Sequence, residues 1–362
     1  MSLATLPAAD AIARLASFDT IVDARSPAEF AEDHLPGAVN WPVLDNDERR
    51  EVGTEYVQVS AFDARKSGAA IVARRIGDIL QAQVQDKPHG WRPLVYCWRG
   101  GQRSGTLAWF LAQIGFRAMV LQGGYKAFRQ QVREQLTTLP LRFDYTVIAG
   151  RTGSGKTRLL AALADQGAQV LDLEGMARHR GSVLGGLPHE PQPTQKGFET
   201  QLWHALSALD PARPVYVESE SRKIGQLALP TSLLERMRRD SRVLMLTMPD
   251  AARIELLLQE YGFFAEQLER FCGHLDTLVD LRGRETVQHW QALARSGHWA
   301  EVFAALMHEH YDPMYLKSMR SNYAGVAVAR DIVLRDGSAA ALRDAAAQVQ
   351  AITGEGAGAS AP

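Results

Sequence analysis

Short apolar runs and helical repeats alternate along the first part of the chain, a pattern that predicts a small domain of strands and helices. The runs at 20–24 and 93–96 are typical of buried strands, and the apolar positions of 107–114 recur at the spacing of an amphipathic helix. The stretch Ser-Pro-Ala-Glu at 26–29 forms a capping box that opens a helix. The other elements predicted here are a polar inserted loop at 45–60, a helix at 67–84, a strand at 117–121 and a helix at 125–136.

The alternation resumes after a short connector at 137–142 and predicts a second domain. Its expected elements are strands at 145–149, 170–174, 215–218 and 243–247, helices within 251–323, a returning strand at 326–334 and a last helix to about residue 352. The tail at 354–362 is rich in Gly, Ala, Ser and Pro, so we expect it to be disordered. The sequence therefore predicts an α/β protein with one domain at 1–137 and a parallel-sheet domain at 143–353 that includes the helical region.

Composition adds the class of protein. A chain of 362 residues with 46% hydrophobic and 22% charged residues is typical of an ordinary globular protein with two domains. Because the chain has no long apolar run and no basic, apolar leader, we expect neither a membrane span nor a signal peptide. Its two cysteines, Cys97 and Cys272, lie far apart, which favours a reducing cytoplasm over a disulfide scaffold. The net charge of −1 leaves any contact with nucleic acid to local basic groups.

The first candidate for chemistry is the loop Tyr-Cys-Trp-Arg-Gly-Gly-Gln-Arg-Ser at 96–104, which joins a predicted strand to a predicted helix. Its two glycines allow backbone N–H groups to point at the sulfur of Cys97, and the start of a helix favours negative charge. Arg99 and Arg103 add positive charge. These features favour a reactive thiolate, so Cys97, Arg99 and Arg103 are the candidate catalytic residues. The alternative is a cysteine that only packs in the core.

The second candidate follows the strand at 145–149, which runs directly into Gly-x-x-x-x-Gly-Lys-Thr. This is the phosphate loop, or P-loop, in its required setting between a strand and a helix. The backbone N–H groups of such a loop cradle a diphosphate, Lys156 meets its outer oxygens, and Thr157 is able to hold Mg²⁺. The candidate diphosphate-binding residues are Gly150, Arg151, Thr152, Gly153, Ser154, Gly155, Lys156 and Thr157.

The sequence predicts no metal site built by protein ligands alone. Asp172 or Glu218, each at the end of a predicted strand, is a candidate to assist Mg²⁺, and the alternative for both is a solvated charge. His308 and His310 are two positions apart, which is poor spacing for a shared metal on a helix. We expect Cys272, within a helical run, to serve packing.

Four segments in order resemble a rhodanese domain: Asp-Ala-Arg-Ser-Pro-Ala-Glu-Phe at 23–30, His-Leu-Pro-Gly-Ala-Val-Asn at 34–40, the Cys97 loop, and Leu-Gln-Gly-Gly-Tyr at 121–125. The resemblance implies that Cys97 carries sulfur or selenium as a persulfide or perselenide. It leaves two roles open for Asp23 and Arg25, which are either groups of the active site or partners in a structural salt bridge.

The succession of a rhodanese-like domain and a P-loop domain resembles the tRNA 2-selenouridine synthase family over nearly the whole chain. Further family-like stretches occur at 51–56, 179–182 and 220–225. The resemblance implies a transferase that replaces sulfur by selenium in the wobble 2-thiouridine of tRNAs for Lys, Glu and Gln. It implies selenophosphate as the selenium donor and a preceding transfer of a geranyl group from geranyl diphosphate to the sulfur. We expect no tightly bound cofactor, with Mg²⁺ as an option, and no membrane partner.

Contact with tRNA requires local positive charge, because the chain as a whole is nearly neutral. The candidate tRNA-binding residues are Arg178, Arg180, Arg222 and Lys223. The alternative for each group is a solvated face.

Three alternatives to this function stay open at the level of sequence. The first is a sulfurtransferase fused to a P-loop domain that binds ATP in place of geranyl diphosphate. The spacing from Cys97 to Arg103 also matches the C-x5-R loop of cysteine phosphatases, although Tyr96 stands where many of them carry His. Finally, the chain is compatible with a tRNA-binding module whose rhodanese domain is vestigial.

Overall fold

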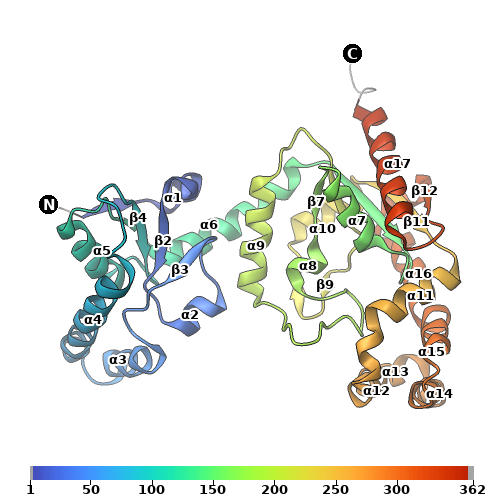
Figure 1. Ribbon diagram of the computed structural model, residues 1–362, viewed down its shortest axis with the longest axis horizontal. Helices are drawn as coiled ribbons and strands as arrows, with labels where there is room; N and C mark the ends of the chain where they lie inside the picture. Colours follow the sequence, from blue (N-terminus) through green and yellow to red (C-terminus); the bar gives the residue numbers. More distant parts are fainter. Residues whose placement is uncertain (1–2, 358–362) are drawn as a thin grey trace. The chain divides into compact units, whose positions relative to one another are not determined.

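Two parallel five-stranded sheets organise the chain in the computed structural model, which describes residues 3–357 (Figure 1). Each sheet forms the centre of one compact unit. The first unit comprises the residues up to Gln135 and the segment Pro193–His204, and the second comprises Leu136–Gln192 and the residues from Ala205 onward. The predicted α/β class is confirmed, because each unit is built on a parallel sheet with helices packed against it.

The sheet of the first unit has the strand order β1-β5-β4-β2-β3. Its central strand β4 pairs with β2, where Pro93 lies opposite Thr20, and with β5, where Leu94 lies opposite Met119. Every residue of β4 is buried, as expected of a central parallel strand, and its carboxyl end leads into Cys97. The strands are β1 Ala4–Leu6, β2 Thr20–Asp23, β3 Ala38–Asn40, β4 Pro93–Tyr96 and β5 Met119–Leu121.

One prediction for the first unit is wrong: residues 45–60 form a helix and not an inserted loop. Helix α3 begins with a capping box between Asp45 and Glu48 and packs along α4, where Gly68 lies close to Val52. None of the residues of α3 is buried, and its sequence has no apolar stripe that would predict a helix. The capping box was the available signal, but the polar composition of the segment favoured a loop. The helices are α1 Ala8–Ala13, α2 Pro27–Glu32, α3 Asn46–Gln58, α4 Ala61–Gln83, α5 Gln102–Ile114 and α6 Gly124–Thr138.

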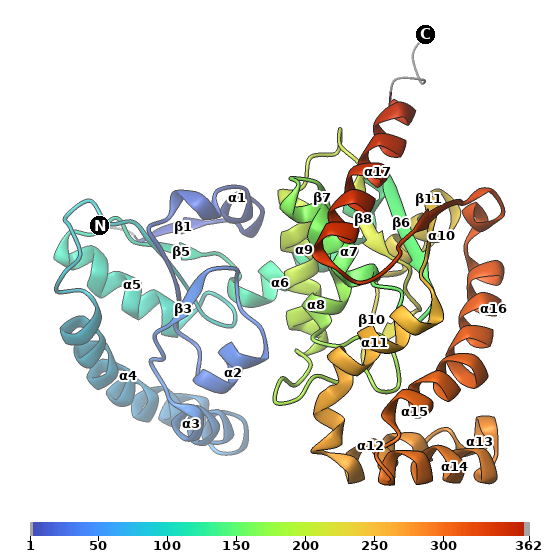
Figure 2. The ribbon, with the colours of Figure 1, turned by 45° about the vertical axis from the view of Figure 1, so that its right-hand side comes forward.

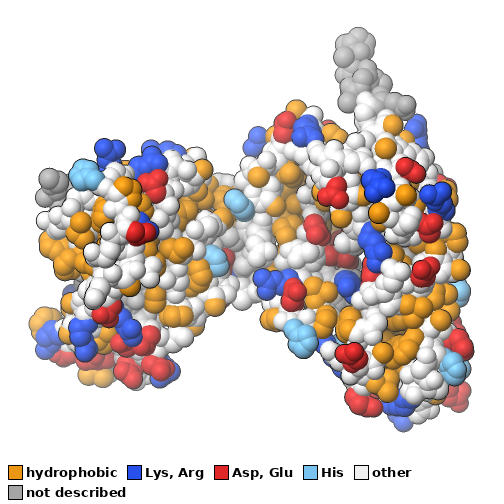
Figure 3. Space-filling view, viewed as in Figure 1, with side chains coloured by type: hydrophobic (Ala, Val, Ile, Leu, Met, Phe, Trp, Pro, Cys, Tyr) orange, Lys and Arg blue, Asp and Glu red, His pale blue; other side chains and the backbone are white. Residues whose placement is uncertain are grey.

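Ion pairs help to hold this polar hairpin together. Arg75 of α4 bonds to Asp45 at 2.8 Å and to Glu48 at 3.3 Å, both at the start of α3. Figure 3 shows basic and acidic side chains intermixed on the surface over α3 and α4. The basic residues of these two helices are therefore largely compensated by their own neighbours.

Segment 193–204 belongs to the first unit although it follows the P-loop in the sequence. It includes the first turns of α9 (Gln195–Ala208). The Thr200 hydroxyl donates to the buried Asp33 carboxylate at 2.9 Å, and Lys196 bonds to Glu32 at 2.6 Å. Trp203 packs edge-on against Phe128. Boundaries drawn in sequence order, 1–137 and 143–353, place this segment in the other domain, because local patterns carry no trace of its distant partners.

The sheet of the second unit has the strand order β12-β11-β6-β8-β7. The central strand β6 pairs with β8, where Ile148 lies opposite Glu218, and with β11, where Leu246 lies opposite Gly150. The strands are β6 Tyr145–Gly150, β7 Gln169–Leu171, β8 Val215–Glu218, β11 Arg242–Thr247 and β12 Arg330–Val333, with a small hairpin of β9 Lys223–Ile224 and β10 Leu227–Ala228. The returning strand predicted at 326–334 is thus shorter, and a 3-10 turn at Ala324–Val328 precedes it.

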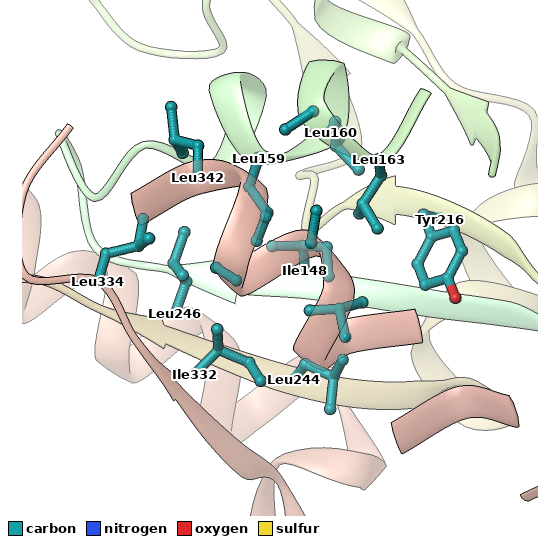
Figure 4. Close-up of a cluster of buried hydrophobic side chains, with 14 of the residues drawn as sticks. Ile148, Leu159, Leu160, Leu163, Tyr216, Leu244, Leu246, Ile332, Leu334 and Leu342 are labelled. Carbon is teal, nitrogen blue, oxygen red and sulfur yellow. The ribbon is translucent and has the colours of Figure 1, made fainter. Parts of the chain in front are cut away.

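Two helices pack side by side against this sheet (Figures 1 and 2). They are α7 (Lys156–Asp165) and α17 (Ala339–Ala357). Figure 4 shows Leu159, Leu160 and Leu163 of α7 packed with side chains of the sheet and of α17 in one buried cluster. Because α17 extends to Ala357, the disordered tail predicted at 354–362 begins too early, and residues 358–362 lie outside the described part.

The predicted helical region forms a second buried cluster around Phe264, Phe271 and Trp290. A π-helical turn at Leu306–Tyr311 leads into α16, the helix that borders the P-loop. The remaining helices of the unit are α8 Leu173–Ala177, α10 Thr231–Arg239, α11 Asp250–Tyr261, α12 Leu268–Asp276, α13 Val279–Arg282, α14 Arg284–Arg295, α15 Trp299–Ala305 and α16 Asp312–Asn322. Among the described residues, no helix is both long and apolar enough to cross a membrane.

Candidate functional site

The Cys97 loop is held in place by the segment that starts α6. The Tyr125 N–H donates to the Cys97 carbonyl at 2.8 Å, and the Lys126 N–H donates to the Trp98 carbonyl at 3.0 Å. Gly124 has a φ of +58°, and a Cβ atom there would lie 2.3 Å from the Cys97 carbonyl oxygen. Gly100, at a φ of +66°, faces the same segment. The two chain segments approach so closely that only glycine fits.

Cys97 is buried, and only 3% of the residue is exposed. The Ser104 hydroxyl donates a hydrogen bond to the sulfur over 3.2 Å. Ser104 lies in the first turn of α5, and sequence reasoning gave it no role. The pattern Cys-x6-Ser across a helix start was the signal available for it.

The two arginines of the loop differ in their surroundings. Arg103 forms an ion pair with Glu29 of α2 at 2.7 Å, whereas Arg99 is exposed and forms no ion pair within residues 3–357. Burial opposes the charge of Glu29, yet the hydrogen bond and charge of Arg103 hold the pKa of Glu29 below its ordinary value. Because Arg103 is already neutralised, it is poorly placed to bind a phosphate oxyanion. This arrangement favours a chalcogen carrier over a cysteine phosphatase.

Asp23 and Arg25 form an ion pair of 2.6 Å in which both side chains are fully buried. Arg25 also donates to the Asp33 carbonyl at 2.6 Å, and its guanidinium lies 3.9 Å from the centre of the Tyr125 ring. These contacts tie β2 to α2 and α6. The structure therefore contains the salt bridge between Asp23 and Arg25 that was one of the two alternatives for these residues.

The P-loop joins β6 to α7 as its sequence pattern requires. Gly153 and Gly155 have φ values of +73° and +82°, which permit the tight curl of the loop. The Lys156 ammonium donates to the Gly150 carbonyl at 2.9 Å and lies 5.7 Å from the centre of the Tyr315 ring. The Gly150 N–H in turn donates to the Tyr315 hydroxyl at 2.6 Å. Tyr315 of α16 is thus a close neighbour of the P-loop, and no sequence motif predicted this contact.

A buried ion pair links the helical region to the same loop. Arg253 of α11 bonds to Asp312 at 2.6 Å and donates to the Thr152 carbonyl at 2.8 Å. Asp312 also bonds to Arg151 of the P-loop at 3.2 Å. Arg253 has an exposure of only 1%, so the backbone of the loop is positioned by a charge network from two helices. Sequence reasoning missed both residues, which lie 101 and 161 positions from their partners in the loop.

The P-loop opens into a cleft of about 660 Å³ in the second unit. Lys156 and Thr157 lie in its lining, whereas other parts of the wall are apolar or aromatic. These wall residues are Val183, Leu187, Leu256, Leu257, Tyr261, Tyr311, Met314, Tyr315, Met319 and Tyr323. The cleft therefore offers a phosphate-binding element beside an apolar surface large enough for a small organic group.

Three carboxylates converge in this cleft. Glu174 of α8, Glu218 at the end of β8 and Glu220 two residues later bring one oxygen each within 4.8 Å of one another. Burial, followed by the charges of its neighbours, raises the pKa of Glu174 to about 10, and burial with the charge of Glu218 raises that of Glu220 to about 8. Thr157 donates to Glu174 at 3.5 Å.

Of the two acids predicted to assist a metal ion, only one lies in this group of carboxylates. Glu218 belongs to the group of three, but Asp172 caps α8 by accepting from the Gly175 N–H at 2.8 Å and is not a member. Sequence reasoning missed Glu174 and left Glu220 unassigned. The local signal for Glu174 was its position as an acidic residue in the first turn of a short helix after β7.

The basic candidates separate into two groups. Arg178, Arg222 and Lys223 are exposed. Arg180 instead lines the cleft, where it donates to the Glu260 carbonyl at 2.6 Å and lies 4.9 Å from the centre of the Tyr261 ring. The structure thus brings Arg180 to the cleft with the P-loop. Cys272 is buried in α12, and burial raises its pKa above the ordinary value for a thiol.

Comparison with known families matches both parts of the chain. A family described as the tRNA 2-selenouridine synthase AAA domain matches residues 143–278, and the rhodanese-like domain matches residues 7–131. Among curated proteins, the chain is 38% identical to a tRNA 2-selenouridine synthase of Nitrosomonas europaea over 67% of this chain and 63% of that protein. It is 31% identical to one of Bdellovibrio bacteriovorus over 84% of this chain and 90% of that protein. A synthase of Salmonella newport is 33% identical over the same shares.

Proposed function

The chain belongs to the tRNA 2-selenouridine synthase family, and on this premise we propose how its two sites divide the reaction between them. Enzymes of this family, this chain included, convert 2-thiouridine to 2-selenouridine in tRNA. Selenophosphate is the selenium substrate that the family implies. Since the reaction takes place on tRNA, we place it in the cytoplasm.

The first site supplies the selenium. Cys97 is the carrier, and the Ser104 hydroxyl and the N-terminus of α5 stabilise its thiolate. Arg103 holds the start of α2 through Glu29 and so shapes the loop, whereas exposed Arg99 is free to meet an anionic selenium donor. The sulfur's depth in the loop keeps the carried atom away from bulk water.

The second site prepares the tRNA. Geranyl diphosphate binds with its diphosphate in the P-loop and its hydrocarbon chain on the apolar wall of the cleft. The thiouridine sulfur attacks the first carbon of the geranyl group, the carbon–oxygen bond breaks, and diphosphate leaves. Nucleophilic selenium from the donor then attacks C2 of the geranylated uridine, the carbon–sulfur bond breaks, and the sulfur leaves as geranyl thiolate, a better leaving group than the original thiocarbonyl sulfur. The observation that carries this proposal is the cleft itself, because a phosphate loop and an apolar surface meet in it. ATP is the competing ligand.

Nucleoside mass spectrometry of two variants tests this division. Each is incubated with thiolated tRNA, geranyl diphosphate and selenophosphate. Cys97→Ala should accumulate geranylated tRNA, because the alkylated sulfur belongs to the tRNA. Lys156→Ala should accumulate plain 2-thiouridine, since losing the ammonium costs about 3 kcal/mol of leaving-group stabilisation, or about 100-fold in rate.

Two results would contradict the proposal. If Cys97→Ala is folded and binds tRNA yet cannot geranylate, the sites do not divide the reaction. If Lys156→Ala geranylates normally, the P-loop serves another ligand, with ATP the first to test. Cys272→Ala is the matched control for the loss of a buried thiol and should form both products.

For tRNA binding we propose the exposed residues Arg178, Arg222 and Lys223 as contacts with the phosphate backbone, and tRNAs for Lys, Glu and Gln as substrates. Reversing Arg178 to Glu should weaken tRNA binding and lower its salt dependence by about one unit of slope. Arg343→Glu, an exposed reversal on α17, is the control. Equal effects of the two changes in a filter-binding titration would remove Arg178 from the footprint.

A further inference from the structure

The P-loop is built to bind an anion, yet its cleft presents three carboxylates. Lys156 is the cation beside them, and the charges of Glu218, Glu174 and Glu220 all act on it. When all carboxylates that line the cleft are ionised, three cations face five negative charges and leave two uncompensated; the cations are Lys156, Arg158 and Arg180, and the carboxylates are those of Asp172, Glu174, Glu218, Glu220 and Glu260. A diphosphate brings several more negative charges into the same cleft. An additional positive charge is therefore needed to bring the two together.

The spacing of the carboxylates suits a hard divalent cation. Their nearest oxygens lie within 4.8 Å of one another. Oxygens on opposite sides of a Mg²⁺ ion lie about 4.2 Å apart, and neighbouring ones about 3 Å, for bonds of about 2.1 Å. The three side chains come from separate elements, α8, the end of β8 and the loop after it, so they approach a common point from different directions. Small movements of these side chains would complete the coordination.

One oxygen of the group shows independently that a partner belongs there. The Oε1 atom of Glu218 is buried and has no hydrogen-bond partner among residues 3–357, and the residue as a whole is only 2% exposed. Such an atom is costly to leave unsatisfied inside a protein. Glu218 lines the cleft, so its unsatisfied oxygen is available to a ligand bound there.

We propose that Glu174, Glu218 and Glu220 together form a divalent cation site that binds Mg²⁺ before any diphosphate arrives. This differs from a site in which phosphate oxygens supply most of the ligands, because here the protein itself contributes three carboxylates. The cation then neutralises the cleft and allows the diphosphate into the P-loop. The binding of the cation stands on the carboxylates alone, whereas its effect on the diphosphate rests on the proposed function.

Electron paramagnetic resonance of Mn²⁺ with the full chain tests the cation site without any substrate. The wild-type chain should bind one Mn²⁺ in the absence of phosphate, and Mg²⁺ should displace it. Glu174→Gln and Glu220→Gln should each weaken Mn²⁺ binding at least tenfold. Asp172→Asn removes a charge from the same cleft but keeps its cap on α8, and it should leave Mn²⁺ binding within twofold. Absence of Mn²⁺ binding to the wild-type chain overturns the proposal, as does equal loss in all three variants.

Calorimetry with inorganic pyrophosphate separates this proposal from the proposed function. Pyrophosphate should bind the wild-type chain at least tenfold more tightly with Mg²⁺ than without it. A chain with all three glutamates changed to Gln should lose that dependence. Binding that is equal with and without Mg²⁺ in the wild type overturns the coupling while leaving the P-loop as a diphosphate site. Mn²⁺ binding without any pyrophosphate binding supports the cation site and instead removes diphosphate from the P-loop.

Discussion

The Cys97 loop and the P-loop have the same kind of backbone structure, but one is covered by its neighbours and the other is open. Each is a glycine-rich turn between a parallel strand and a helix N-terminus. The first is closed by the start of α6, so that Cys97 is 3% exposed. The second opens into a cleft of about 660 Å³. In both loops the glycine-rich turn orients backbone N–H groups. The neighbouring elements determine whether the loop is suited to carry a single atom on Cys97 or to bind a larger ligand in a cleft.

The charges around the two loops differ in the same way. In the first, Arg103 is matched by Glu29, so the site is close to electrical balance. In the second, Lys156 faces three carboxylates and acidic charge is in excess. A balanced site suits a carrier that must hold its atom without further ligands. A site with excess negative charge requires a further, positively charged ligand. Four predictions test this difference between the two loops.

The largest effect should come from the network that supports the open loop. Arg253→Met leaves Asp312 buried without its closest partner, and breaking one side of such a pair costs about 3–5 kcal/mol. Denaturant unfolding followed by tryptophan fluorescence should show this loss. Geranyl transfer should fall, whereas alkylation of Cys97 in the folded chain should be unchanged.

A double variant checks the cause. Arg253→Met with Asp312→Leu removes both charges and should recover part of the stability, because no unpaired charge stays buried. Geranyl transfer should stay low, since the Thr152 carbonyl still lacks its donor. A double variant as unstable as the single one would mean that packing, and not charge, holds the loop.

The next effect concerns the closed loop. Gly124→Ala places a Cβ atom 2.3 Å from the Cys97 carbonyl oxygen at a positive φ. The left-handed conformation alone costs roughly 1–2 kcal/mol, and the clash adds to it. Selenium transfer should be lost while geranyl transfer persists. Gly105→Ala, whose Cβ would meet no atom within 4 Å, is the control and should change neither step.

A smaller effect should follow removal of the donor to the sulfur. Ser104→Ala takes away the hydroxyl 3.2 Å from Cys97, and a hydrogen bond to a charged group is worth about 1.5 kcal/mol. Alkylation of Cys97 by iodoacetamide at pH 7 should therefore slow about tenfold. Thr106→Ala removes a hydroxyl of the same helix that bonds to the Gln102 carbonyl, and it should leave the rate unchanged. In every variant Cys272 should react slowly, since burial raises its pKa.

The smallest effect is a dependence on pH. The folded-state pKa of Glu29 is lowered, so its pair with Arg103 adds stability above the unfolded value near 4.5 and loses it as pH falls through the lower folded value. Glu29→Gln should cost about 1 kcal/mol at pH 7 and less at pH 3. Thermal melts at both pH values measure this. A constant difference between the two would show that Glu29 acts through its cap on α2 alone.

Local patterns in the sequence were enough for both reactive loops. The capping box at Ser26, the apolar stripe of α5 and the phosphate-loop spacing each depend on residues within a few positions of one another. The structure therefore repeats them with small shifts of boundary. Failure came where the local pattern was weak, as in α3, which buries none of its residues and has no apolar stripe to detect.

Tertiary structure alone decided what surrounds each loop. Arg103 meets Glu29 across 74 positions, and Arg253 and Asp312 reach the P-loop from 101 and 161 positions away. Glu174, Glu218 and Glu220 converge only because β7 and β8 lie next to each other and end at the same edge of the sheet. Such meetings depend on the order of strands in a sheet and on helices that return from afar. Hydrophobic periodicity reports which face of an element is buried, but not which distant element covers it.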